Sequence, residues 1–89
     1  MLEREISISN KLGLHTRASA KLVQTLHGFQ STIFMGYRGK EVNAKSIMGV
    51  MMLAAGVGSE VEIETEGADE QAAVDAIVAL IDDKFGEGQ

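Results

Sequence analysis

Residues 60–66 alternate strictly between acidic side chains and side chains suited to a core. Glutamates occupy positions 60, 62, 64 and 66, and Val61, Ile63 and Thr65 lie between them. Successive side chains of a β-strand point to opposite faces of a sheet, so the segment predicts a strand with one acidic face. Only a sheet that is open to water on one side accommodates such a strand. The fold must therefore cover one face of its sheet and leave the other bare.

Three other segments have the apolar spacing of amphipathic helices, which supply that cover. They are residues 16–27, residues 46–53 and residues 69–85. Ser46 and Asp69 are expected to cap the second and third helices, and Lys84 to lie in the last turn of the third. The expected core-facing positions of the first and third helices are Ala18, Leu22, Val23, Leu26, Val74, Ile77, Val78 and Ile81.

The remaining strands are expected at residues 5–8, 31–37 and 40–43, and the last two form a hairpin that turns at Arg38 and Gly39. The order of elements is then β-α-β-β-α-β-α. We expect an α+β fold, a two-layer open-faced sandwich with three helices on one face of the sheet. A chain of 89 residues has room for one modest core, so we expect a single domain over residues 1–89.

The composition excludes several classes of protein. The chain has no cysteine, which excludes a disulfide scaffold and a thiolate metal site. The N-terminus is charged, unlike a secretory signal, and no apolar run approaches the about 20 residues that span a bilayer. The acidic balance and the scarcity of aromatic residues argue against nucleic-acid binding. We expect a cytoplasmic protein without membrane insertion, metal or cofactor.

The charge is divided unevenly along the chain. Residues 1–45 hold seven of the eight basic side chains and three acids, whereas residues 46–89 hold one base, Lys84, and ten acids. The division allows a basic patch around His15 with the acidic residues elsewhere. It is equally compatible with charges that only solvate the surface.

The segment KLGLHTRASA, residues 11–20, places His15 just before a helix start and Arg17 in its first turn. A single histidine in a loop is more often a surface or capping residue than a catalytic one. Here Gly13 lets the backbone bend closely, the helix start offers unpaired N–H groups, and Arg17 adds a planar fork of donors. A neutral imidazole is a nucleophile near pH 7. The segment therefore predicts a nucleophile beside an anion site, which is the arrangement that phosphoryl transfer requires.

The segment from Ser46 to Leu53 allows two interpretations. As a short core helix it would bury Ile47, Val50 and Leu53. Its methionines cannot all point inward with them, which predicts an adaptable exposed patch suited to partner docking, formed by Met48, Met51 and Met52. Ser46 is most simply a helix cap, but a phosphate at a helix start would also be well tolerated.

These residues, with residues 69–85, resemble the HPr family, the histidine-containing phosphocarriers of the bacterial phosphotransferase system. Three blocks carry the resemblance, namely residues 11–20, residues 44–53 and the closing helix, and the match extends over essentially the whole chain. The resemblance implies a four-stranded antiparallel sheet with strand order 1-4-2-3. Two positions depart from the family pattern: Ala18 replaces a usual proline, and Thr16 replaces a frequent alanine.

The resemblance also implies a role for each candidate residue. His15 would receive a phosphoryl group on Nδ1 from phosphoenolpyruvate by way of Enzyme I and pass it to a IIA domain of a sugar permease or a regulatory relative. Arg17 would bind the phosphate. Ser46 would be phosphorylated by HPr kinase/phosphorylase where that enzyme exists. Ile47, Met48 and Met51 would dock partners.

Three functions remain open at this point. The leading hypothesis is a monomeric, stoichiometric phosphoryl carrier that is a substrate of its partners and not itself an enzyme. The second is a regulatory adaptor that acts mainly through Ser46 in a system without full sugar transport. The third is a binding module without a phosphorelay role, because a fold alone does not fix a function.

Overall fold

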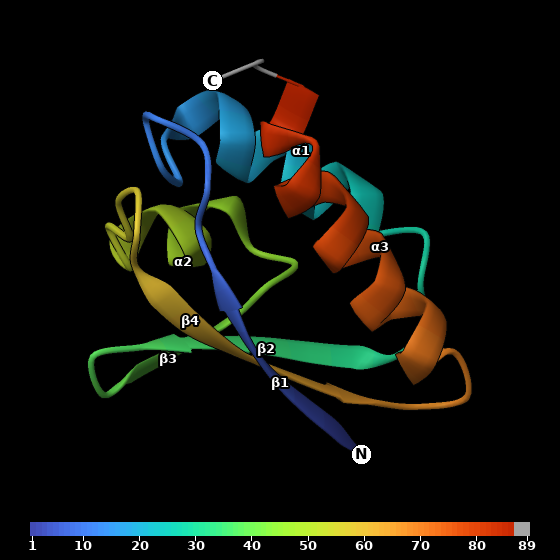
Figure 1. Cartoon of the computed structure of the whole chain (residues 1–89). Coiled ribbons are helices and arrows are strands. Elements are labelled where there is room, and N and C mark those ends of the chain that lie inside the picture. Colours follow the sequence, from blue (N-terminus) through green and yellow to red (C-terminus); the bar gives the residue numbers. More distant parts are fainter. Residues whose placement is uncertain (87–89) are drawn as a thin grey trace.

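The computed structural model describes residues 1–86 and has the expected order of elements (Figure 1). Residues 87–89 of the expected domain lie outside the described residues. The elements are β1 (Leu2–Ser7), α1 (Thr16–Leu26), β2 (Thr32–Tyr37), β3 (Lys40–Asn43), α2 (Ile47–Met52), β4 (Glu60–Glu66), α3 (Glu70–Asp82) and the 3₁₀ turn η1 (Lys84–Gly86).

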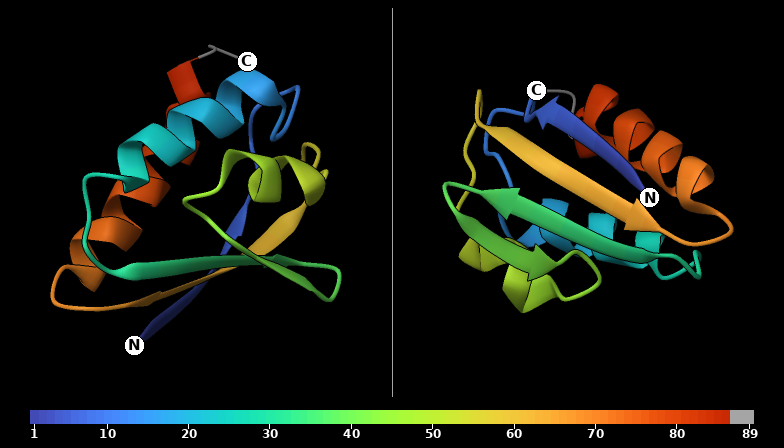
Figure 2. Two further views of the ribbon diagram at one scale, coloured as in Figure 1. Left: turned by 180° about the vertical axis from the view of Figure 1, so that it is seen from behind. Right: turned by 90° about the horizontal axis from the view of Figure 1, so that it is seen from below.

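The four strands form an antiparallel sheet in the order β1-β4-β2-β3, which confirms the expected topology. All three α-helices lie on one side of this sheet, and the other side is bare (Figures 1 and 2). Strand β4 lies between β1 and β2, so its inward side chains are well covered. Val61, Ile63 and Thr65 are buried, as the alternation in the sequence predicts.

The open face of the sheet carries glutamates in direct opposition. The register of β1 and β4 pairs Glu3 with Glu64 and Glu5 with Glu62, and like charges placed in this way repel. The neighbouring Glu60 carboxylate, together with Glu62, raises the pKa of Glu5 above its usual range. The pKa of Glu64 is raised as well, chiefly by the charge of Glu41 on β3. The acidic face predicted for residues 60–66 therefore extends over three strands.

The core lies between the sheet and the helices. Helix α1 contributes Ala18, Leu22 and Leu26, all of them fully buried, and packs against both α2 and α3. In α3 the buried positions are Ala73, Val74, Ile77 and Ile81. Val78, which was expected to face the core, is half-buried, because Ala73 takes the remaining inward position.

Two expectations about α3 are wrong. Asp69 occupies the N-cap position, but its side chain makes no capping hydrogen bond to α3. Its carboxylate instead accepts hydrogen bonds from the backbone N–H groups of Gln30 and Ser31 and from the Ser31 hydroxyl, and so fastens the start of β2. Lys84 lies beyond the helix, which ends at Asp82, because the backbone turns into the left-handed region at Lys84 and Phe85.

Candidate functional site

A loop fastened by hydrogen bonds precedes α1. The buried Asn10 side chain donates from Nδ2 to the Gly13 carbonyl at 2.7 Å, and the Gly13 N–H donates to the Asn10 carbonyl at 3.1 Å. Gly13 has φ +67°, and a Cβ atom there would lie 2.6 Å from the Ala55 carbonyl oxygen, so the position requires glycine. The Leu14 N–H donates to that same Ala55 carbonyl at 2.9 Å. These bonds hold the backbone in place immediately before His15.

His15 is the N-cap residue of α1, with an extended backbone and a half-buried side chain. Its ring Nδ1 accepts a hydrogen bond from the backbone N–H of Arg17 at 3.3 Å. A ring nitrogen that accepts carries a lone pair and no proton, so the neutral ring has its hydrogen on Nε2. The lone pair of Nδ1 therefore points at the start of the helix, where backbone N–H groups and the positive end of the helix dipole favour an anion.

The first turn of α1 is well suited to negative charge. It contains no acidic residue, and Thr16 and Arg17 are exposed. Among residues 1–86 the Arg17 guanidinium makes no ion pair, so its donors are available to an anion from outside. Ala18 is fully buried, and the Ser19 hydroxyl donates to the Leu14 carbonyl at 3.0 Å. This part of the turn has a structural role and anchors the segment on either side of His15.

Helix α2 presents the second group of candidate residues. The Ser46 hydroxyl caps it by accepting from the Gly49 N–H at 3.2 Å, as expected. Val50 and Leu53 are buried, but Ile47 is 37 % exposed, so the expectation that Ile47 enters the core is wrong. Val50 and Leu53 already fill the inward side of this short helix. Four exposed apolar side chains remain, which we call the α2 patch: Ile47, Met48, Met51 and Met52.

The loop after α2 joins this patch to the loop that holds His15. Helix α2 ends at Met52, its C-cap is Leu53, and Ala54 follows with φ +53°. That turn brings the Ala55 carbonyl to the Leu14 N–H. Leu12 and Val57, one in each of these loops, are exposed and extend the apolar surface. Neither was singled out from the sequence, because loop residues have no periodicity from which exposure could be predicted.

Lys45 links α1 to α2, a role that sequence reasoning also missed. Its Nζ donates to the Phe29 carbonyl at 2.7 Å, and its backbone N–H donates to Asn43 Oδ1 at 2.8 Å. Its own carbonyl lies 3.1 Å from His27 Nε2, at the C-terminal end of α1. The residue before the α2 cap is thus fastened to the end of α1, which fixes the spacing between the two helices.

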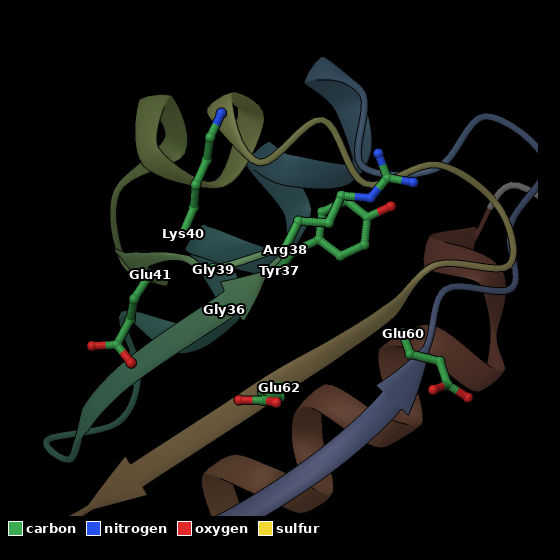
Figure 3. A pocket seen from close by; sticks show the side chains of 8 residues that line it. All are labelled: Gly36, Tyr37, Arg38, Gly39, Lys40, Glu41, Glu60 and Glu62. Carbon is green, nitrogen blue, oxygen red and sulfur yellow. The ribbon is translucent and has the colours of Figure 1, made fainter.

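Basic and acidic side chains both lie at the β2–β3 hairpin. A shallow hollow of about 280 Å³ lies on the sheet there, lined by hairpin residues and by Glu60 and Glu62 of β4. Figure 3 shows Lys40 extending toward α2 and Arg38 lying against the Tyr37 ring, with the carboxylates grouped around the strands. The hollow combines both charges on an open surface. It lacks the enclosed apolar lining of a small-molecule site.

Residues 1–86 contain no cluster of three or more His, Asp and Glu side chains arranged to hold a metal ion. Within the same residues, no helix has both the length and the apolar character needed to cross a membrane. His15 and His27 lie at opposite ends of α1.

Comparisons with known proteins identify the family. Residues 2–83 match a family model whose description is the phosphorylation site of the HPr component of the phosphotransferase system. The chain is 61 % identical over 89 residues to the phosphocarrier protein HPr of Cupriavidus necator, which covers all of both chains. A crystal structure of HPr from Thermoanaerobacter tengcongensis has a TM-score of 0.94 at 49 % identity and covers 98 % of each chain. A dimeric HPr from the same organism has a TM-score of 0.78 at 49 % identity, covering 98 % of this chain and 100 % of the other. The chain therefore belongs to the HPr family of phosphotransferase-system phosphocarriers.

Proposed function

We propose that this chain is a phosphoryl carrier that accepts a phosphoryl group from phosphorylated Enzyme I on His15 Nδ1 and passes it to a IIA domain. The observation that carries the proposal is the hydrogen bond from the Arg17 N–H to His15 Nδ1. It directs the lone pair of Nδ1 at a helix start, where an attached phosphoryl group would meet backbone donors and the Arg17 guanidinium.

The transfer needs no catalytic base on this chain. The Arg17 N–H gives up its hydrogen bond to Nδ1, whose lone pair forms a bond to phosphorus. The bond between phosphorus and the phosphoryl donor breaks, and its electron pair leaves with that donor. The proton on Nε2 stays in place. The backbone donors and Arg17 then stabilise the negative charge that has arrived, without a covalent bond to it. The group can leave by the same route, so the chain is a carrier and its partners supply the catalysis.

The α2 patch supplies the docking surface in this proposal. Ile47, Met48 and Met51 lie exposed on a helix whose following loop is bonded to the loop before His15. Methionine side chains are flexible, so one patch can fit both Enzyme I and different IIA domains. The proposed carrier acts as a monomer in the cytoplasm. Analytical ultracentrifugation distinguishes this state from a dimer such as the one that the T. tengcongensis relative forms.

The test is phosphorylation of the purified chain by Enzyme I and phosphoenolpyruvate. We expect a product that is labile in acid and stable in alkali, as phosphohistidine is, and that is absent from the His15→Ala variant. His27→Ala, which changes the second histidine at the other end of α1, is the matched control and keeps the product. An acid-stable product, or one that persists in His15→Ala, contradicts the proposal.

Arg17 has a separate test. Arg17→Lys keeps the positive charge but loses the planar fork of donors, so we expect slower transfer with unchanged folding. Transfer at the rate of the unsubstituted chain would show that Arg17 does not bind the phosphate.

A second function, regulation through Ser46, is supported by the position of that side chain. Ser46 is exposed and caps α2 directly beside the patch. A phosphate there, added by HPr kinase/phosphorylase, would bring nearly two negative charges to the docking surface and still be tolerated at a helix start. We expect Ser46→Asp to weaken Enzyme I binding in calorimetry, with Ser46→Asn, an uncharged cap, as the control. Equal affinities of the two variants would contradict this role.

A further inference from the structure

The methionines of this chain occupy two contrasting environments. Met35 lies in β2 and is fully buried, with 0 % of its surface exposed. Met48 and Met52, on α2, are 69 % and 68 % exposed, and Met51 is 38 % exposed. The sequence contains no cysteine, so the exposed thioethers are the side chains most readily oxidised under mild conditions. Three of the five methionines thus lie on one six-residue helix at the proposed docking surface.

Oxidation changes the chemistry of such a side chain without removing it. Hydrogen peroxide transfers one oxygen atom to the thioether sulfur, which loses two electrons and becomes a sulfoxide, while the peroxide is reduced to water. The product is polar and accepts hydrogen bonds, whereas the thioether is apolar. A methionine sulfoxide reductase returns the sulfur to the thioether with electrons from a dithiol, so the modification is reversible.

We propose that Met48 and Met52 are a redox modification site, and that peroxide oxidation of these two sulfurs weakens partner docking without altering His15. The inference rests on the proposed function, because it assigns a regulatory input to the same docking surface. Residues 48 and 52 are one helical turn apart, so their side chains are neighbours on α2. Two sulfoxides there would replace adjacent apolar groups at the centre of the patch.

The rest of α2 keeps the fold independent of the modification. Val50 and Leu53 bury the inner side of the helix, and Ser46 caps it. Met48 and Met52 are both mostly exposed, so their oxidation removes little from the core. Docking becomes less favourable, because a partner that covers the sulfoxide oxygens removes their hydrogen bonds to water without supplying other donors. We therefore expect the KM of Enzyme I for this chain to rise about tenfold while kcat stays the same.

The experiment treats the purified full-length chain with hydrogen peroxide and locates the added oxygen by peptide mass spectrometry. We expect Met48 and Met52 to be oxidised well before Met35, which serves as an internal control. Phosphoryl transfer from Enzyme I is then measured before treatment, after treatment and after repair by a methionine sulfoxide reductase. The prediction is a KM that rises and returns, with kcat and the rate of phosphohistidine hydrolysis unchanged. An unchanged KM when both sulfoxides are present overturns the inference.

Two variants separate the site from general damage. Each variant is compared with its own untreated sample. The ratio of treated to untreated KM should fall toward one for Met48→Leu/Met52→Leu, which keeps only the less exposed Met51 on α2, and should remain high for Met51→Leu, which keeps both proposed sites. A high ratio for the double variant would place the effect elsewhere. Failure of the untreated, unsubstituted chain to accept a phosphoryl group would instead refute the proposed function, so the two failures are distinguishable.

Discussion

Ala54 is one of four non-glycine residues with a positive φ among the described residues, and its replacement by glycine gives a sharp test. It follows Leu53, the C-cap residue of α2, with φ +53°, in the left-handed region, and its side chain is exposed. An L-residue pays about 1–2 kcal/mol in that region, because Cβ approaches the following carbonyl oxygen. Glycine avoids this cost but gains about 0.5–1 kcal/mol of freedom in the unfolded chain. We expect Ala54→Gly to stabilise the protein by roughly 0.5–1 kcal/mol.

The assay is urea denaturation followed by circular dichroism, supported by thermal melting. For a domain of this size, the expected gain corresponds to a rise in Tm of roughly 2–8 °C. The matched control is Ala79→Gly, at an exposed position in the helical backbone of α3, where the same substitution should destabilise by about 1 kcal/mol. If Ala54→Gly destabilises the chain as Ala79→Gly does, then the left-handed strain at Ala54 is refuted.

Three further variants test electrostatics and the contact between the helices. The Ser31 hydroxyl and two backbone N–H groups hold the pKa of Asp69 below its usual value of 3.8, so Asp69→Asn should cost stability at pH 7 but not once the pH falls through the lowered pKa. Glu60 raises the pKa of Glu5 above its usual value of 4.5, so the folded state loses stability as the pH rises and both carboxylates become charged. Glu60→Gln should therefore stabilise the protein at pH 7 and not at pH 4. Lys45→Met removes the hydrogen bond from its Nζ to the Phe29 carbonyl, in the loop after α1, and should destabilise by about 1–2 kcal/mol.

Each of these variants has an exposed counterpart that carries the same chemical change. They are Asp75→Asn, Glu66→Gln and Lys40→Met, and free energies of unfolding from urea titrations compare the members of each pair. A loss at Asp69 that does not depend on pH would contradict the assigned role of the carboxylate. A gain in stability from Glu60→Gln that persists in acid would contradict the charge repulsion between Glu60 and Glu5. Equal losses of stability in Lys45→Met and Lys40→Met would contradict the role of Lys45 in linking the helices.

The sequence predicts the parts of this fold that depend on local periodicity. The alternation over residues 60–66 indicates a one-sided sheet, and the spacing in residues 16–27 indicates a helix with His15 before it; both agree with the structure. Ser46 was predicted as a cap and is one. The strand order followed from the family resemblance, because periodicity does not specify which strands pair.

What could not be predicted depends on partners far away in the chain. Asp69 has the sequence position of a cap. Its carboxylate instead accepts hydrogen bonds from Gln30 and Ser31, which precede it by 39 and 38 positions in the chain. Lys45 looks like an ordinary surface cation until the fold brings the Phe29 carbonyl to its Nζ. Ile47 has the composition of a core residue but lies outside, because Val50 and Leu53 already fill the limited inner face of α2. Such roles are set by tertiary contacts.

The glutamates of the open face also influence how an acidic partner reaches this molecule. Helices α1 and α2 lie on the opposite side of the sheet, with the Arg17 guanidinium exposed at the start of α1 (Figure 1). An acidic partner that approaches the sheet is repelled by the glutamates, whereas one that approaches the start of α1 meets the positive Arg17 side chain, so the field favours one orientation before the molecules touch. Such steering shortens the rotational search that normally slows protein association, and its benefit fades as salt screens the charges. The bare side of the sheet would thereby contribute to the rate of the encounter that we propose for the opposite side.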